Sequence, residues 1–139
     1  MKARTGGPVG RWIALVALAV LLLLPRIASA DVGDYRVTDA SKIYLGNAKL
    51  FQRPCVISCD RVYREIPEYR EILEKGLTDR DVRYHFLMKK ASERFAEAVK
   101  QAAKDLDVDL VAELGSVRPA KKDVDPPPDR TTEVIGKLS

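Results

Sequence analysis

The sequence predicts an α+β fold: a small body of strands, a shortened, coiled-coil-like helical hairpin that leaves the body and returns to it, and a C-terminal helix. Two short segments, 54–59 and 107–114, alternate apolar and polar residues with the period of half-buried strands. The segment between them, 60–105, repeats its apolar residues every three or four positions, which is the helical period. The helices are therefore expected to form an excursion between two strands of one body.

The first thirty residues have the three-part pattern of a secretory signal peptide. A basic start precedes the unbroken apolar run WIALVALAVLLLL at 12–24, and Ala28-Ser29-Ala30 forms a small-residue cleavage site. The run is shorter than the roughly 20 residues that a membrane-spanning helix needs. We therefore expect a periplasmic or secreted protein whose mature chain begins at Asp31, with a retained N-terminal anchor helix as the alternative.

Removal of this segment changes the charge balance. The full chain has 24 Lys and Arg against 20 Asp and Glu, and the basic residues of the segment are Lys2, Arg4, Arg11 and Arg26. Without the first thirty of its 139 residues, the chain is formally neutral, so its charge gives no reason to expect nucleic-acid binding. The remaining length suits one small domain with a thin core, and self-association often adds stability to such a domain.

The N-terminal part of the mature chain is expected to form an arm or hairpin, followed by the first strand. Residues 31–53 contain Gly46-Asn47, a turn signal between two short apolar stretches. In 54–59, PCVISC, the alternation places Cys55, Ile57 and Cys59 on one face of a strand. Asp60 is expected to cap the helix that follows.

The helical segment 60–105 is expected to be broken twice. A short turn ends before Pro67, which suits the first position of a helix, and Gly76 suits the end of that helix. The longest helix is expected from Asp79 to Asp105. Its apolar residues step by four and three, as in a coiled-coil seam: Tyr84, Met88, Ala91, Phe95, Ala98 and Ala102. An amphipathic helix packed on its own domain fits this pattern equally well.

The C-terminal part is expected to return to the body. Residues 107–114, DVDLVAEL, alternate as a second strand, and the proline- and charge-rich residues 118–129 predict an exposed loop. Residues 131–138 are expected to form a short helix whose Val134, Ile135 and Leu138 dock on the body, although Gly136 weakens it.

This order of elements resembles the Skp/OmpH family of periplasmic chaperones, over residues 54–139. CVISCDRVYREIPEY, at 55–69, resembles that family's first strand entering a helix, and AAKDLDVDLVAELGSV, at 102–117, resembles its closing helix and strand. DRTTEVIGKL, at 129–138, resembles its terminal helix. The resemblance implies a homotrimer whose barrel-like body carries helical arms. These arms bind unfolded outer-membrane proteins without catalysis and without a cofactor.

The predicted excursion is far shorter than the usual arm of that family. A helix from Asp79 to Asp105 reaches only about 40 Å, so a cavity large enough for a whole client does not follow from the resemblance. The candidate client or helix–helix contacts are Tyr84, Met88 and Phe95.

The candidate basic arm surface consists of Arg83, Lys89 and Lys90. In the chaperone interpretation these residues attract acidic clients or the head groups of a membrane surface. A plain solvated helix face is the alternative, because acidic residues are interspersed with them.

The sequence contains no enzyme motif: there is no G-x-S-x-G, no glycine-rich phosphate loop and no H-E-x-x-H. The competing hypothesis is a periplasmic thiol or copper-binding protein that uses Cys55 and Cys59, with His85 as a distant ligand. Their C-x-x-x-C spacing resembles that of copper chaperones of the Sco type. Four residues of a strand span about 13 Å, however, which is too far for a disulfide or for one shared metal ion. We therefore expect both thiols to be buried and unpaired within one chain, with pairing across an oligomer axis as the alternative.

Overall fold

The computed structural model describes residues 31–138, and the predicted signal peptide lies outside the described residues. Within the described range, no helix has the length and apolar character needed to cross a membrane. Strands and helices are both present, so the predicted α+β class is confirmed.

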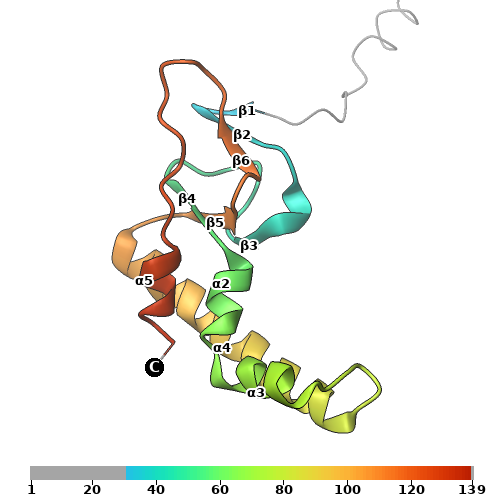
Figure 1. The fold of residues 1–139 in the computed structure, drawn as a ribbon. Helices are drawn as coiled ribbons and strands as arrows, with labels where there is room; N and C mark the ends of the chain where they lie inside the picture. Colours follow the sequence, from blue (N-terminus) through green and yellow to red (C-terminus); the bar gives the residue numbers. More distant parts are fainter. Residues whose placement is uncertain (1–30, 139) are drawn as a thin grey trace, which may run out of the picture.

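Two three-stranded sheets make up the body of the molecule (Figure 1). The first contains β1 (Asp31–Val32), β2 (Tyr35–Val37) and β6 (Val117–Pro119), all antiparallel. The second contains β3 (Ile43–Leu45), β5 (Leu110–Glu113) and β4 (Pro54–Ile57). In it the central β5 runs antiparallel to β3 and parallel to β4. The two sheets are linked along the chain, because β2 leads to β3 through the short 3-10 helix η1 (Ala40–Lys42) and β5 leads to β6.

Three helices connect the parallel strands β4 and β5: α2 (Cys59–Arg64), α3 (Pro67–Lys75) and α4 (Val82–Leu106). A fourth helix, α5 (Thr131–Ile135), packs on α2, α4 and β4. The C-terminal part of α4 lies under the second sheet, whereas α3 and the N-terminal part of α4 extend away from it side by side (Figure 1). We call this pair the α3–α4 hairpin.

Strand β4 ends at Ile57 instead of the predicted residue 59, because the helix that follows starts earlier than predicted. The Oγ of Ser58 accepts a hydrogen bond from the backbone N–H of Arg61 (3.4 Å), which starts α2 at Cys59. The prediction that Asp60 caps this helix is therefore wrong. Cys59 belongs to α2 and not to the strand face that holds Cys55 and Ile57.

The breaks between the helices agree with the proline and glycine signals. Pro67 occupies the first turn of α3, and Gly76 ends it in a left-handed conformation (φ 61°). The long helix starts at Val82 rather than Asp79, because residues 78–81 form a turn in which an Oδ of Asp81 accepts the backbone N–H of Thr78 (2.9 Å).

Several other boundaries differ from the sequence prediction. Strand β5 starts at Leu110 instead of the predicted residue 107, because Asp107 adopts φ 55° and ends α4 as a left-handed cap. The last helix stops at Ile135, next to Gly136, rather than at residue 138. The predicted loop 118–129 begins inside β6. Within residues 31–53, β1 and β2 form an antiparallel pair, β3 pairs with β5, and Asn47 and Leu50 close a turn by an isolated antiparallel bridge.

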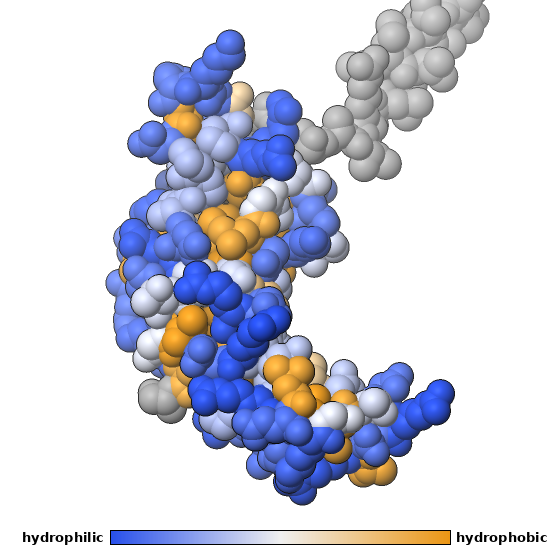
Figure 2. All heavy atoms as spheres, in the orientation of Figure 1, coloured by the Kyte–Doolittle hydropathy of each residue, from blue (hydrophilic) through white to orange (hydrophobic). Residues whose placement is uncertain are grey.

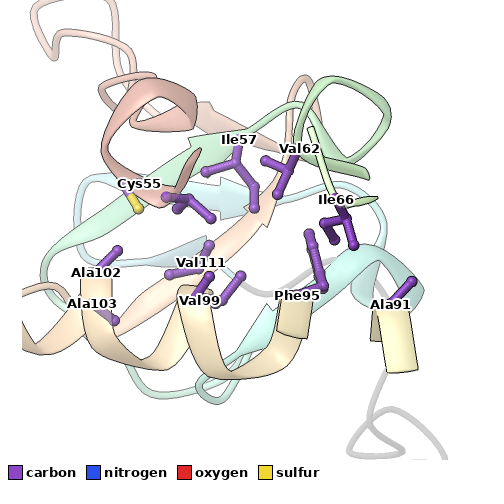
Figure 3. Close-up of a cluster of buried hydrophobic side chains, with 12 residues drawn as sticks. Cys55, Ile57, Val62, Ile66, Ala91, Phe95, Val99, Ala102, Ala103 and Val111 are labelled. Carbon is purple, nitrogen blue, oxygen red and sulfur yellow. The ribbon is translucent and has the colours of Figure 1, made fainter. Parts of the chain in front are cut away.

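The main core lies between the second sheet and α4. Figure 3 shows Cys55 and Ile57 of β4 and Val111 of β5 over Val99, Ala102 and Ala103 of α4. The small alanines let the helix backbone approach the sheet closely, and each fully buried Val or Ile contributes roughly 1.5–3 kcal/mol. This packing holds the base of the α3–α4 hairpin rigidly on the body.

Candidate functional site

The distal part of the α3–α4 hairpin exposes large apolar side chains. Leu73 of α3 is 54% exposed, and Val82 and Phe86 of α4 are 86% and 57% exposed. Figure 2 shows the molecule as a crescent, with hydrophobic surface visible over the hairpin end. We call Leu73, Val82 and Phe86 the tip residues. Large exposed apolar side chains at one end of a molecule are candidates for an interaction site.

Among the three predicted contact residues, Phe95 takes a role different from Tyr84 and Met88. Phe95 is 7% exposed and stacks on Tyr63 of α2, with ring centroids 4.9 Å apart, and meets Tyr44 of β3 edge-on at 5.1 Å. It therefore packs within its own chain and presents no surface to a client. Tyr84 and Met88, nearer the tip, are half-buried.

The spacing could not separate these roles, because all three residues share one stripe of α4. Their exposure depends on which element covers each turn of the helix. The tip residues Val82 and Phe86, by contrast, lie off the predicted seam and are not among the predicted contact residues. Their signal was two large apolar residues at i and i+4, outside the stripe that holds Tyr84 and Met88.

The predicted basic surface is divided among three different environments. The Nε of Arg83 donates to Glu71 of α3 (2.7 Å), and this carboxylate also accepts from Lys75 (2.9 Å). The hydrogen bonds from Lys75 and from Arg83 lower the pKa of Glu71. The ammonium of Lys90 lies over the ring of Phe86, 4.7 Å from its centroid, in cation–π geometry. Lys89 is exposed. Arg83 therefore joins α4 to α3 through Glu71, whereas Lys89 and Lys90 contribute positive charge to the outer surface of the hairpin.

The two cysteines lie in unreactive surroundings. Both are free thiols; Cys55 is 1% exposed, and Cys59 is half-buried at the start of α2. Burial raises the pKa of Cys55 to about 11 and also raises the pKa of Cys59. Thiols with raised pKa values are weak nucleophiles near neutral pH, because little thiolate is present.

The geometry does not bring His85 to the cysteines. Cys55 packs near Ala102 (Figure 3), and His85 lies seventeen residues earlier in the same helix, a distance of about 25 Å along the axis. The Nε2 of His85 is 2.6 Å from the carbonyl oxygen of Asp79. Within residues 31–138, no group of three or more His, Cys, Asp or Glu side chains could hold a metal ion.

A partly buried polar contact at the end of β5 joins β3 to the start of α2. One Oε of Glu113, at the end of β5, accepts the hydroxyl of Tyr44 (2.7 Å) and the backbone N–H of Cys59 (3.0 Å). Burial, together with this hydrogen bond, raises the pKa of Tyr44. Sequence reasoning missed the contact because its partners are 69 and 54 residues apart, and no local pattern links them.

A second polar contact fixes the C-terminal helix. The hydroxyl of buried Thr131 accepts the backbone N–H of Ser58 (2.9 Å) and donates to Asp129 (2.5 Å). The hydrogen bonds from Thr131 lower the pKa of Asp129. Both polar contacts are partly buried and join elements far apart in the chain, so we assign them structural roles.

Comparison with known proteins found no matching protein family, no matching curated protein and no matching solved structure.

Proposed function

We propose that this is an exported, non-catalytic Skp/OmpH-like protein that binds unfolded outer-membrane or other envelope proteins. In this proposal the α3–α4 hairpin is a short arm. The observation that carries it is the exposure of Leu73, Val82 and Phe86 at the distal end of a helical excursion between two neighbouring strands. An unfolded client offers apolar segments that such side chains can cover.

The arrangement of charges supports the same proposal. Lys89 is exposed next to the apolar side chains, and Lys90 covers one face of the Phe86 ring. A surface that combines apolar groups with cations attracts acidic clients and membrane surfaces while it contacts their apolar segments. The raised pKa values of buried Cys55 and half-buried Cys59 do not favour the thiol or copper-binding alternative.

One hairpin offers few apolar contacts, so we propose that several copies act together, as in the homotrimer that the resemblance implies. Linked weak sites raise the overall affinity through a high effective concentration. The hairpin is short, and we therefore propose that the arms hold segments of a client rather than enclose a whole chain.

An aggregation assay tests the proposal. A urea-unfolded outer-membrane barrel protein is diluted into buffer with and without the mature chain from Asp31, and light scattering is followed. We expect suppression by the native protein and a loss of suppression in the triple variant Leu73→Ser, Val82→Ser, Phe86→Ser. The matched control is Leu114→Ser, because Leu114 is a 45% exposed leucine located on the body.

Sedimentation of the same samples tests the assembly. A monomer at high concentration that leaves aggregation unchanged would refute the chaperone role. Stoichiometric Cu(I) binding that is lost in Cys55→Ser or Cys59→Ser would support the copper-binding alternative instead.

A further inference from the structure

The C-terminal part of the chain docks on the body through polar and apolar contacts. We call residues 128–138 the C-terminal tail. Along the edge of β4, the N–H of Val56 donates to the carbonyl of Pro128 (3.0 Å), and the N–H of Arg130 donates to the carbonyl of Val56 (2.9 Å). Val134 of α5 is 1% exposed and belongs to the main core. The tail therefore covers the edge of the second sheet and completes part of the core.

The docking site of the tail is built from elements that are remote from it in the sequence. Helix α5 packs on α2, α4 and β4, which all precede β5 in the chain. Lys137 forms an ion pair with Asp105 of α4, and the hydroxyl of Thr131 accepts the N–H of Ser58, the cap of α2. None of these partners belongs to β6 or to the loop that joins β6 to the tail. The same site on another copy of the chain therefore fits the tail equally well.

The loop between β6 and the tail has few polar contacts with the body. Among the described residues, such contacts of 120–127 occur only at its start: the N–H of Ala120 donates to the carbonyl of Asp34 (2.8 Å), and Lys121 forms an ion pair with the Asp34 side chain (3.5 Å). Figure 1 shows the loop as an arch that rises beyond β6 and turns back to α5. Its eight residues reach about 25 Å when they are extended, at roughly 3.1 Å per residue. An opened loop can therefore carry the tail to a neighbouring chain.

We propose that the C-terminal tail is exchanged between copies, so that the tail of each chain docks on α2, α4 and β4 of the next. Because the copies are identical, the exchange keeps every contact of the tail, and such domain swapping is a low-cost route to an oligomer. In the proposed homotrimer, three exchanges close a ring. This inference rests on the assembly in the proposed function and identifies the segment that joins the copies.

The composition of the loop favours the neighbouring chain as the docking partner. A short flexible linker would hold the tail near its own site at a millimolar effective concentration, and this advantage is lost where the linker cannot easily span the two ends. Residues 126–128 are three consecutive prolines, whose fixed φ angles favour an extended, stiff spacer. The proline run therefore opposes the turn that brings the tail back to its own chain, whereas an extended loop suits the exchange.

Carbodiimide coupling of the ion pair between Lys137 and Asp105 tests the exchange without any substitution. The reagent joins an amine and a carboxylate that are in direct contact, and both side chains are accessible (35% and 57% exposed). Equal amounts of unlabelled and heavy-nitrogen-labelled mature chain are unfolded in urea, mixed, refolded together and coupled. Mass spectrometry of the digested protein then shows whether the two halves of each linked peptide come from one chain or from two.

We expect about half of the links between Lys137 and Asp105 to join a labelled peptide to an unlabelled one, which is the random share for links between chains in an equal mixture. The internal control is the ion pair of Lys75 and Glu71 (2.9 Å), four residues apart in α3, whose links should never be mixed. If the links between Lys137 and Asp105 are also never mixed, the proposal is overturned, because each tail then docks on its own chain.

Sedimentation of two matched variants tests the tail as the element that joins the copies. Val134→Asp places a charge in the core contact of the tail, so it should convert the trimer into a monomer. Val124→Asp makes the same change in the loop, where the side chain is half-buried, and should leave the assembly intact. A trimer that persists in Val134→Asp would overturn the proposal, and the coupling experiment decides alone if this variant does not fold.

The aggregation assay separates this inference from the proposed function. Mixed links in a protein that does not suppress aggregation would refute the chaperone role and retain the exchange. Suppression of aggregation by a protein that forms only unmixed links would refute the exchange alone.

Discussion

Two phenylalanines in the same helix provide a direct test of the division between core and tip. Phe95→Ala removes a ring that is 7% exposed and contacts two tyrosine rings, so we expect a loss of about 3–5 kcal/mol in the free energy of unfolding. For a domain of about 100 residues, each kcal/mol lowers Tm by about 4–8 °C. The melting temperature should therefore fall by at least about 12 °C.

Phe86→Ala makes the same chemical change nine residues earlier in α4. Phe86 is 57% exposed, so the substitution mainly removes the contact of its ring with the Lys90 ammonium, which is worth about 0.5–1 kcal/mol. Alanine is also the better helix former, and this offsets part of that loss. We expect stability within about 1 kcal/mol of the native chain.

Urea unfolding followed by circular dichroism measures the free energy of unfolding of both variants. The aggregation assay is then run at a temperature where both are folded. Phe86→Ala should weaken the suppression of aggregation, and Phe95→Ala should retain it. The reasoning is refuted if Phe86→Ala destabilises the fold as much as Phe95→Ala, because Phe86 would then be part of the core. It is equally refuted if Phe95→Ala leaves stability unchanged.

Three further predictions follow from the geometry. A Cβ on Gly46 would lie 2.3 Å from the carbonyl oxygen of Asp109 at φ 99°, so Gly46→Ala should cost about 2–4 kcal/mol in urea unfolding. The control Gly33→Ala has the same kind of positive φ (60°) but no atom within 4 Å of the added Cβ, so it should cost only about 1–2 kcal/mol. Equal losses of stability in the two variants would contradict the clash at Gly46. In native protein at pH 7, a thiol reagent should modify half-buried Cys59 slowly and Cys55 only after unfolding; fast labelling of both would contradict their burial. Because the pKa of Asp129 is lowered in the folded chain, its contribution is present above the unfolded value near 3.9 and is lost as pH falls through the lower folded value. Asp129→Asn should therefore shrink the stability difference between pH 7 and pH 3, and an unchanged difference would show that the Thr131 contact contributes nothing.

The helix breaks illustrate how far local chemistry reaches. Pro67 and Gly76 act within one or two residues of themselves, so the sequence predicted the start and the end of α3. The start of α2 was missed because both Ser58 and Asp60 are good N-caps. In the structure Ser58 caps the helix, and Glu113 of β5 accepts the N–H of Cys59 at its first position.

The tip shows the opposite case. The stripe Tyr84, Met88 and Phe95 was correctly seen as one face of a helix, but periodicity describes only the helix itself. The aromatic rings of Tyr44 and Tyr63 come from β3 and α2 and bury Phe95. Phe86 lies outside this stripe and is 57% exposed.

The sequence by itself therefore determined the α+β class, the order of strand and helices, and the breaks at Pro67 and Gly76, because these depend on periodicity and on backbone preferences within a few residues. Only the tertiary structure decided which apolar residues of α4 form the core and which capping residue starts α2. The reason is physical: exposure and hydrogen-bond pairing are set by partners that lie dozens of residues away along the chain.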